Sequence, residues 1–142
     1  MWKIERKLYN RIKSHYDNRG GEGDNSGHFE LMPLTIQNEI ILLTGIDINK
    51  EFVLFASYLK DEYLVVITDQ NLYWLSSENT IKHTALEKLK SVNYKIYESH
   101  KSQLGCLELR TNEGEQFMIK MEEGKTRSSI NNVLLLIIRL RK

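Results

Sequence analysis

The chain has 142 residues, of which 41% are hydrophobic and 27% are charged, and its formal net charge is +1. This length and composition are typical of one globular domain and exclude a disordered, collagen-like or low-complexity chain. A net charge near zero produces no overall electrostatic field toward nucleic acid, so we expect no nucleic-acid partner and, at most, a local basic surface.

The first predicted element is an amphipathic helix over residues 2–16. Ile4, Leu8 and Ile12 recur every four residues and form one apolar stripe along a helix. The other faces are strongly basic, with a local net charge of +4. Their charged residues are Lys3, Arg6, Lys7, Arg11 and Lys13, against the single acid Glu5.

Two interpretations of this basic helix stay open. In one, Trp2 and the cations Lys3, Lys7 and Arg11 lie on an anionic membrane. In the other, which is the commoner arrangement, the charges face water while the apolar stripe packs on the domain.

A run of turn-forming residues follows the helix. Residues 17–27 contain several glycines and no apolar side chain, so they cannot contribute to a core and are predicted to form a flexible loop. We therefore expect residues 1–27 to form the basic helix with its glycine-rich loop, and residues 28–142 to form the folded domain.

The next part of the chain has the pattern of short strands. Segments rich in β-branched and aromatic residues alternate with polar connections, several of which have the length of hairpin turns. About seven antiparallel strands are expected. The segments cover residues 39–44, 52–58, 63–68, 71–76, 80–84, 89–96, 104–111 and 116–121. Tyr73 and Trp74 are adjacent aromatic residues in one of these strands, and we regard both as candidate anchors for a partner.

The last predicted element is an amphipathic helix over residues 126–142, with Ser128 or Ser129 as its cap. Leu135 and Leu136 widen its apolar face beyond what one sheet surface needs. Packing in the core is the commoner explanation, but contact of Leu136 with the first helix or with another protein stays open. The rest of the face contains Ile130, Val133, Leu134, Ile137, Ile138 and Leu140.

The order of elements and one local phrase resemble the pleckstrin-homology-like family, in its bacterial and GRAM-related versions. The phrase covers residues 62–75, where a hydrophobic strand, a Thr-Asp turn and a second strand ending in aromatic residues follow one another. Residues 81–92 and the late hairpin of residues 104–117 are similar to the stretches that follow in the family. The resemblance extends over residues 36–142.

This resemblance implies an α+β fold in which a seven-stranded antiparallel barrel or sandwich is followed by a C-terminal helix. It also implies a scaffold that binds lipids, peptides or proteins without catalysis, and the fold alone does not choose among these. Members that bind phosphoinositides carry clustered basic residues in the first strand-loop-strand. The corresponding residues 45–51 contain one lysine beside two acids, so an inositol phosphate ligand is not implied here.

Candidate catalytic residues are scarce. The histidines lie in four separate segments, and none is spaced from a second metal ligand as a helix or strand site requires. Cys106 falls among leucines in a predicted strand, where a buried and inert thiol is the common case. We expect no catalytic residue, no metal site and no cofactor. The histidines are His15, His28, His83 and His100.

The single cysteine rules out a disulfide within the chain, and the first residues lack the apolar run of a secretory signal. A cytoplasmic location is therefore expected, with the membrane surface open as a contact. The favoured function is a non-catalytic module that binds another protein, for example an immunity-type or regulatory protein. The alternative is peripheral binding to anionic lipid through the basic helix, and an enzyme is the least favoured class.

Overall fold

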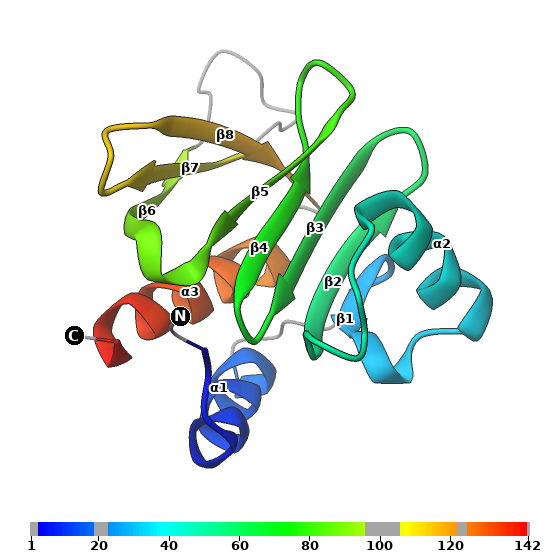
Figure 1. Cartoon of the computed structure of the whole chain (residues 1–142), viewed down its shortest axis with the longest axis horizontal. Coiled ribbons are helices and arrows are strands. Elements are labelled where there is room, and N and C mark those ends of the chain that lie inside the picture. The colour runs from blue at the N-terminus through cyan, green and yellow to red at the C-terminus, as the bar shows by residue number, and fades with distance from the viewer. Residues whose placement is uncertain (1–2, 19–22, 96–105, 122–124, 142) are drawn as a thin grey trace.

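The structure is a computed structural model that describes residues 3–18, 23–95, 106–121 and 125–141 (Figure 1). In these residues the fold is mixed α+β, with three α-helices and two antiparallel sheets, which confirms the predicted class. The helices are α1 (Arg6–Asn18), α2 (Leu34–Thr44) and α3 (Lys125–Leu140), and two 3-10 turns are η1 (Phe29–Leu31) and η2 (Leu86–Lys88).

The larger sheet has five strands in the order β1-β2-β3-β4-β5, and the smaller sheet has three in the order β6-β7-β8. Every neighbouring pair is antiparallel, as the short connections predicted. The strands are β1 (Ser26–His28), β2 (Val53–Leu59), β3 (Tyr63–Thr68), β4 (Asn71–Leu75), β5 (Ile81–Ala85), β6 (Leu89–Lys95), β7 (Cys106–Thr111) and β8 (Gln116–Lys120).

The strand count and the closure differ from the expected seven-stranded barrel. Among the described residues there are eight strands, and the two sheets remain separate rather than closing on each other. The chain leaves β5 through the turn η2 and starts the second sheet at β6, so no strand is shared between the sheets.

The hairpins form where the residues tolerate unusual backbone conformations. Asp61, Asn79 and Gly114 have φ of 64°, 62° and 85° in the three turns that follow β2, β4 and β7. These residue types are the ones that adopt left-handed conformations at low cost. Between β3 and β4, the Thr68 hydroxyl accepts hydrogen bonds from the backbone N–H groups of Gln70 and Asn71 at 3.1 and 2.8 Å, which stabilises the tight turn.

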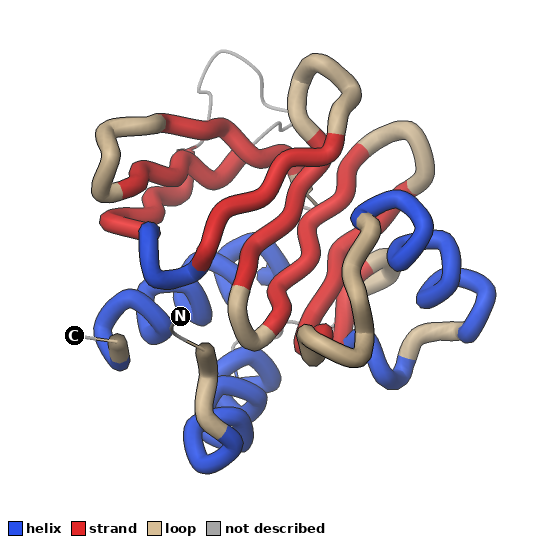
Figure 2. The backbone as a smooth tube through the Cα atoms, viewed as in Figure 1, coloured by secondary structure: helices blue, strands red, loops and turns tan. Residues whose placement is uncertain are grey.

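The central strands are covered on both faces. All six residues of β3 are buried, as are the first six residues of β2. Both strands are buried because helices cover the larger sheet on each side. Figure 2 shows α1 and α3 on one side of this sheet and α2 on the other. A strand covered on both faces reads as a continuous apolar run rather than an alternating one, as these two strands do.

Each face of the larger sheet has its own core. One core joins the sheet to α1, α3 and the smaller sheet, and its largest side chains include Trp74, Tyr16 and Phe55. The other lies under α2 and η1 and includes Phe29 and Ile40. Nearly all large apolar residues of β2 to β4 belong to one core or the other, which leaves the middle of the sheet no free surface.

The first helix is part of the main core. Ile12 and Tyr16 of α1 are fully buried, and α1 packs against α3. The Tyr16 ring stacks on Phe55 of β2 with centroids 4.1 Å apart, and the Ser129 hydroxyl of α3 donates to the Tyr16 carbonyl oxygen at 2.8 Å. Of the two interpretations of this helix, the structure therefore contains the one in which the apolar stripe packs on the rest of the chain.

The prediction of a strand at residues 39–44 is wrong, because this segment is the second half of α2. Pro33 precedes the first turn, and Gly45 follows the last one with φ of 71°, the left-handed conformation that ends many helices. Between these two signals the inward residues Ile36 and Ile40 recur at the helical spacing of four.

The prediction of a loop without core contacts over residues 17–27 is also wrong in part. α1 continues to Asn18, and β1 adds an edge strand that pairs with β2. Ser26 is buried there, and its hydroxyl donates to the hydroxyl of Ser57 at 2.6 Å. Small polar residues can therefore join the sheet, because the hydroxyl groups of Ser26 and Ser57 form a hydrogen bond with each other. Residues 19–22 lie outside the described part of the chain.

Candidate functional site

Three of the residues predicted to face a partner are buried. Trp74 is 1% exposed and lies in the main core against Phe117, with ring centroids 4.9 Å apart. Tyr73 is buried in the other core, because neighbouring residues of β4 point to opposite faces and both faces are covered. Leu136 is buried in α3. None of these side chains can anchor a partner from where the structure places it.

The Tyr73 hydroxyl belongs to a hydrogen-bond network around one carboxylate. Glu51 accepts hydrogen bonds from Thr68, Asn71 and Tyr73 at 2.7, 2.7 and 2.6 Å. Burial, and then the bond to Glu51, raise the pKa of Tyr73 well above its ordinary value. The network fastens the segment before β2 to the β3–β4 hairpin, so Glu51 has a structural role here.

The first helix begins at Arg6 rather than at residue 2, so Lys7 and Arg11 lie on the exposed side of α1 and Lys3 lies before it. Lys3, Lys7 and Arg11 are exposed, while Trp2 lies outside the described residues. Lys7 forms an exposed ion pair with Glu5 at 3.4 Å, which leaves the surface basic overall but not uniformly so.

A groove of about 620 Å³ lies beside this basic end of the chain. Lys3 and Arg6 line it together with Glu5 and Asp69, so charges of both signs face it. Its apolar part is formed by Tyr9 and by Phe52, which meet edge to face at 5.4 Å. The arrangement combines two cations with two anions and does not select a ligand of one charge.

The most exposed apolar side chains lie elsewhere, on η1 and α2. Leu42, Leu31 and Leu34 are 85%, 75% and 73% exposed, and Leu43 is 46% exposed. These four are among the nine large hydrophobic residues that are exposed in the described part of the chain, and they fall within thirteen consecutive residues. We call them the α2 surface. Leu34 and Leu42 lie on the outer side of α2, and Leu43 lies toward the larger sheet. Four exposed leucines this close along the chain differ from single exposed hydrophobic residues, which need no explanation.

A smaller groove of about 200 Å³ runs beside α2, between Leu43 and the outer face of the larger sheet. Its floor is apolar. Its polar lining comes from α2, from the turn between β2 and β3, and from the turn between β4 and β5. We call it the α2 groove. Its apolar residues are Leu43, Tyr58, Tyr63, Leu64, Leu75 and Ile81, and its polar residues are Glu39, Lys60, Asp61 and Asn79.

Glu39 and Tyr58 join α2 to the sheet at the base of this groove. The Tyr58 hydroxyl donates to the Glu39 carboxylate at 2.6 Å. Burial, followed by this hydrogen bond and by the charges of Glu39 and Asp61, raises the pKa of Tyr58 to about 12. The tyrosine is therefore neutral at ordinary pH and remains a donor to Glu39.

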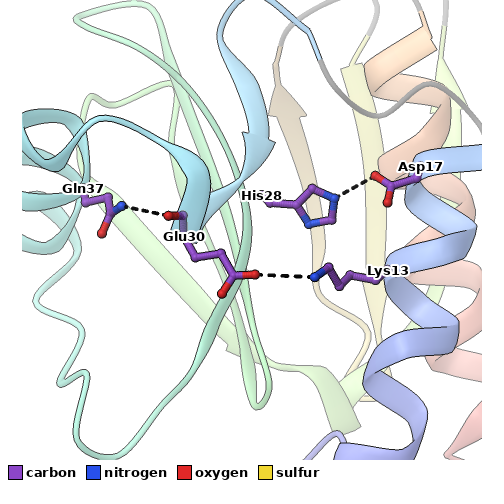
Figure 3. A network of polar contacts seen from close by, with 5 residues as sticks. All are labelled: Lys13, Asp17, His28, Glu30 and Gln37. Atoms are coloured by element: carbon purple, nitrogen blue, oxygen red, sulfur yellow. Dashed lines mark hydrogen bonds and ion pairs between the residues drawn. The ribbon is translucent and has the colours of Figure 1, made fainter.

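A second set of polar contacts connects α1 with the start of α2 (Figure 3). Lys13 of α1 and Glu30 of η1 form an ion pair at 3.5 Å, and the Gln37 amide of α2 donates to the Glu30 carbonyl oxygen at 3.4 Å. The same amide also donates to the Met32 carbonyl oxygen at 2.8 Å. The Nε2 atom of the buried His28 ring lies 2.7 Å from Oδ1 of the Asp17 carboxylate. Together with the contact between Glu39 and Tyr58, these bonds hold α2 in one position although most of its outer side faces water.

The leucines of the α2 surface were missed at the sequence level, because residues 39–44 were assigned to a strand. The usable signals were Pro33 and Gly45, which mark the two ends of a helix of eleven residues. On a helix, Leu34 and Leu42 fall on the side opposite to Ile36 and Ile40. When a helix is apolar on both sides, one side packs on the sheet and the other is left exposed to water.

Metal ligands do not gather in the described residues, where no three histidine, cysteine, aspartate or glutamate side chains are placed to hold an ion. Comparison with family models finds no match, and a search of curated proteins finds no significant relative. No α-helix in the described ranges has both the length and the apolar character needed to cross a membrane.

Proposed function

We propose that this chain is a non-catalytic binding module, of pleckstrin-homology-like type, that recognises a protein partner through the α2 surface. The observation that carries the proposal is the exposure of Leu31, Leu34 and Leu42, each with more than two thirds of its surface in water. Two antiparallel sheets followed by the helix α3 support the family assignment.

The energetic argument concerns the cost of leaving these leucines in water. Burying one exposed leucine contributes about 1.5–3 kcal/mol, so a partner that covers three of them gains several kcal/mol from this term alone. The bond between Glu39 and Tyr58 holds α2 on the sheet before any partner arrives, and Gln37 fastens the helix to the segment that precedes it. A surface that is already ordered loses little conformational entropy on binding.

The test uses the tagged full chain as bait in a lysate of its own source cells, with soluble and membrane fractions kept separate. The variant Leu42→Gln removes an apolar contact from the α2 surface, and Leu135→Gln makes the same change at an exposed position of α3. We expect one soluble partner to be retained by the wild type and by Leu135→Gln but lost with Leu42→Gln. Retention of the same proteins by all three baits would contradict the proposal.

A second candidate function is peripheral binding to an anionic membrane through α1. It is supported by the exposure of Lys7 and Arg11 on α1 and of Lys3 just before it. Because exposed charges are screened by salt, binding to vesicles with anionic lipid should weaken steeply as the salt concentration rises. Reversing Lys3, Lys7 and Arg11 to glutamate should abolish sedimentation with the vesicles, whereas Leu42→Gln should leave it unchanged.

A further inference from the structure

We propose that the partner presents a basic amphipathic segment to the α2 surface, with apolar side chains that cover the leucines and enter the α2 groove, and with lysine or arginine residues at their rim. This inference rests on the proposed function and adds the chemistry of the partner. It follows from the charges around the leucines and from the size of the groove.

The segment that carries the α2 surface has acidic residues and no cations of its own. From residue 29 to residue 49 the chain contains three acids and no lysine, arginine or histidine. The acids are Glu39, Asp47 and Glu30, and Glu30 is already paired with Lys13 of α1. Asp61 adds a carboxylate at the rim of the α2 groove, where Lys60 is the one cation among its lining residues. Charge complementarity therefore favours a partner with basic residues around an apolar centre.

The α2 groove fits a side chain better than a free ligand. Its volume of about 200 Å³ is below the range of roughly 300–1,000 Å³ that small-molecule sites occupy. Leu64, Leu75 and Ile81 give it an apolar floor, which suits one apolar residue of a longer segment that also covers Leu42. An amphipathic helix bound in a groove presents its apolar side chains at positions i, i+3, i+4 and i+7.

Two other occupants fit less well. An anionic membrane would be repelled by Glu39 and Asp47. The basic α1 of a second copy of this chain has the right charge, but its apolar residues Ile12 and Tyr16 are already buried in its own core. A second copy would therefore supply the cations without the apolar side chains.

The experiment measures binding of two labelled helical peptides of about 18 residues to the full chain by fluorescence anisotropy. Both peptides have the same leucine face, and one has lysines and the other glutamates on the remaining positions. We expect the leucine-lysine peptide to bind at least about ten-fold more tightly than the leucine-glutamate peptide, and the double variant Leu34→Gln/Leu42→Gln to lose this binding.

Neutral variants of the same shape test the rim. Glu39→Gln keeps an acceptor for Tyr58, and Asp61→Asn keeps a residue type that tolerates its left-handed backbone. Together they should weaken binding of the leucine-lysine peptide by about three- to ten-fold at low salt, and less at high salt. The control Glu62→Gln removes a carboxylate that pairs with Lys120 outside the groove, and should leave binding unchanged.

The outcomes separate this inference from the proposed function. If both peptides bind equally and both are lost with the leucine variant, the charge of the partner is wrong while the α2 surface remains the binding surface. If the leucine-lysine peptide binds the leucine variant as tightly as the wild type, the inference and the proposed function both fail. Formation of dimers that Leu42→Gln abolishes would identify a second copy as the occupant and overturn the inference.

Discussion

The hydroxyl groups of two buried tyrosines each donate a hydrogen bond to a carboxylate. These bonds satisfy polar groups on the face of the larger sheet that α2 covers. Tyr58 donates to Glu39, and Tyr73 donates to Glu51. Each bond joins a strand of the sheet to a segment outside it. Each bond satisfies part of the hydrogen-bonding capacity of a carboxylate within the fold.

The first prediction concerns the ionisation of Tyr58. Its pKa in the folded chain is about 12, against an ordinary value near 10, so the folded state holds the proton more tightly than the unfolded state. The free energy of unfolding should therefore fall as the pH rises from about 10 to about 12, and be unaffected by this group below that window. Denaturation in urea at several alkaline pH values should show a shallower fall for Tyr58→Phe than for the wild type.

The same prediction can be checked by absorbance during a pH titration. Part of the tyrosinate absorbance should appear only at a pH above the ordinary tyrosine pKa. Tyr58→Phe should remove one late-titrating tyrosine, while the variant Tyr9→Phe, at a half-buried position of α1, should leave the Tyr58 component in place. Titration of all tyrosines together near their ordinary pKa would show that the bond between Tyr58 and Glu39 does not persist in solution.

The helices differ most in how their apolar faces are used. α3 buries Leu136 in the main core, while its neighbour Leu135 is 39% exposed. Its wide apolar face is explained by the number of elements around it, since α3 contacts α1, β6, β7 and η2. α2 has a sheet on one side only, and its second apolar side stays in water.

The second prediction compares the two leucines of α3. Leu136→Ala should lower the free energy of unfolding by about 2–5 kcal/mol, because it leaves a cavity in the main core. Leu135→Ala should change it by less than about 1 kcal/mol, because much of that side chain is already in water. Chemical denaturation of both variants gives the comparison. Equal losses at the two positions would contradict the placement of α3.

At the scale of the whole molecule, α1 is integrated with the fold rather than appended to it. Ile4 and Ile12 lie in the main core, and the backbone N–H of Ile4 donates to the carbonyl oxygen of Asp69 at 2.7 Å. The bonds of Lys13 and Asp17 to Glu30 and His28 connect the same helix to the segment that leads into α2 (Figure 3). The main core therefore depends on α1 being in place, and polar contacts link α1 to the segment that borders the second core.

The third prediction tests this dependence. Ile12→Ala should lower the free energy of unfolding by about 2–5 kcal/mol, since the side chain is fully buried. Arg11→Ala, the exposed neighbour on the same helix, should change it by at most about 0.5 kcal/mol. Urea denaturation measures both. A chain that tolerates Ile12→Ala as well as Arg11→Ala would show that α1 is only loosely attached in solution.

The α+β class, most strand positions and the two terminal helices could be predicted from the amino-acid sequence. Apolar spacing within one element depends only on local geometry, and turn-forming residues such as Asp61 and Gly114 mark the hairpins directly. The segment of residues 39–44 was misassigned because an apolar run that is buried on one side and exposed on the other fits a strand as well as a helix.

Which apolar residues face water depends on contacts between segments that are far apart in the chain. Tyr73, Trp74 and Leu136 became core residues because α2, the smaller sheet and α1 cover the faces on which they lie, and these contacts join segments far apart in the chain. Leu34 and Leu42 became surface residues because nothing in the described structure packs on the outer side of α2. Exposure is a property of the neighbours that the fold brings together, and periodicity within one element does not contain it.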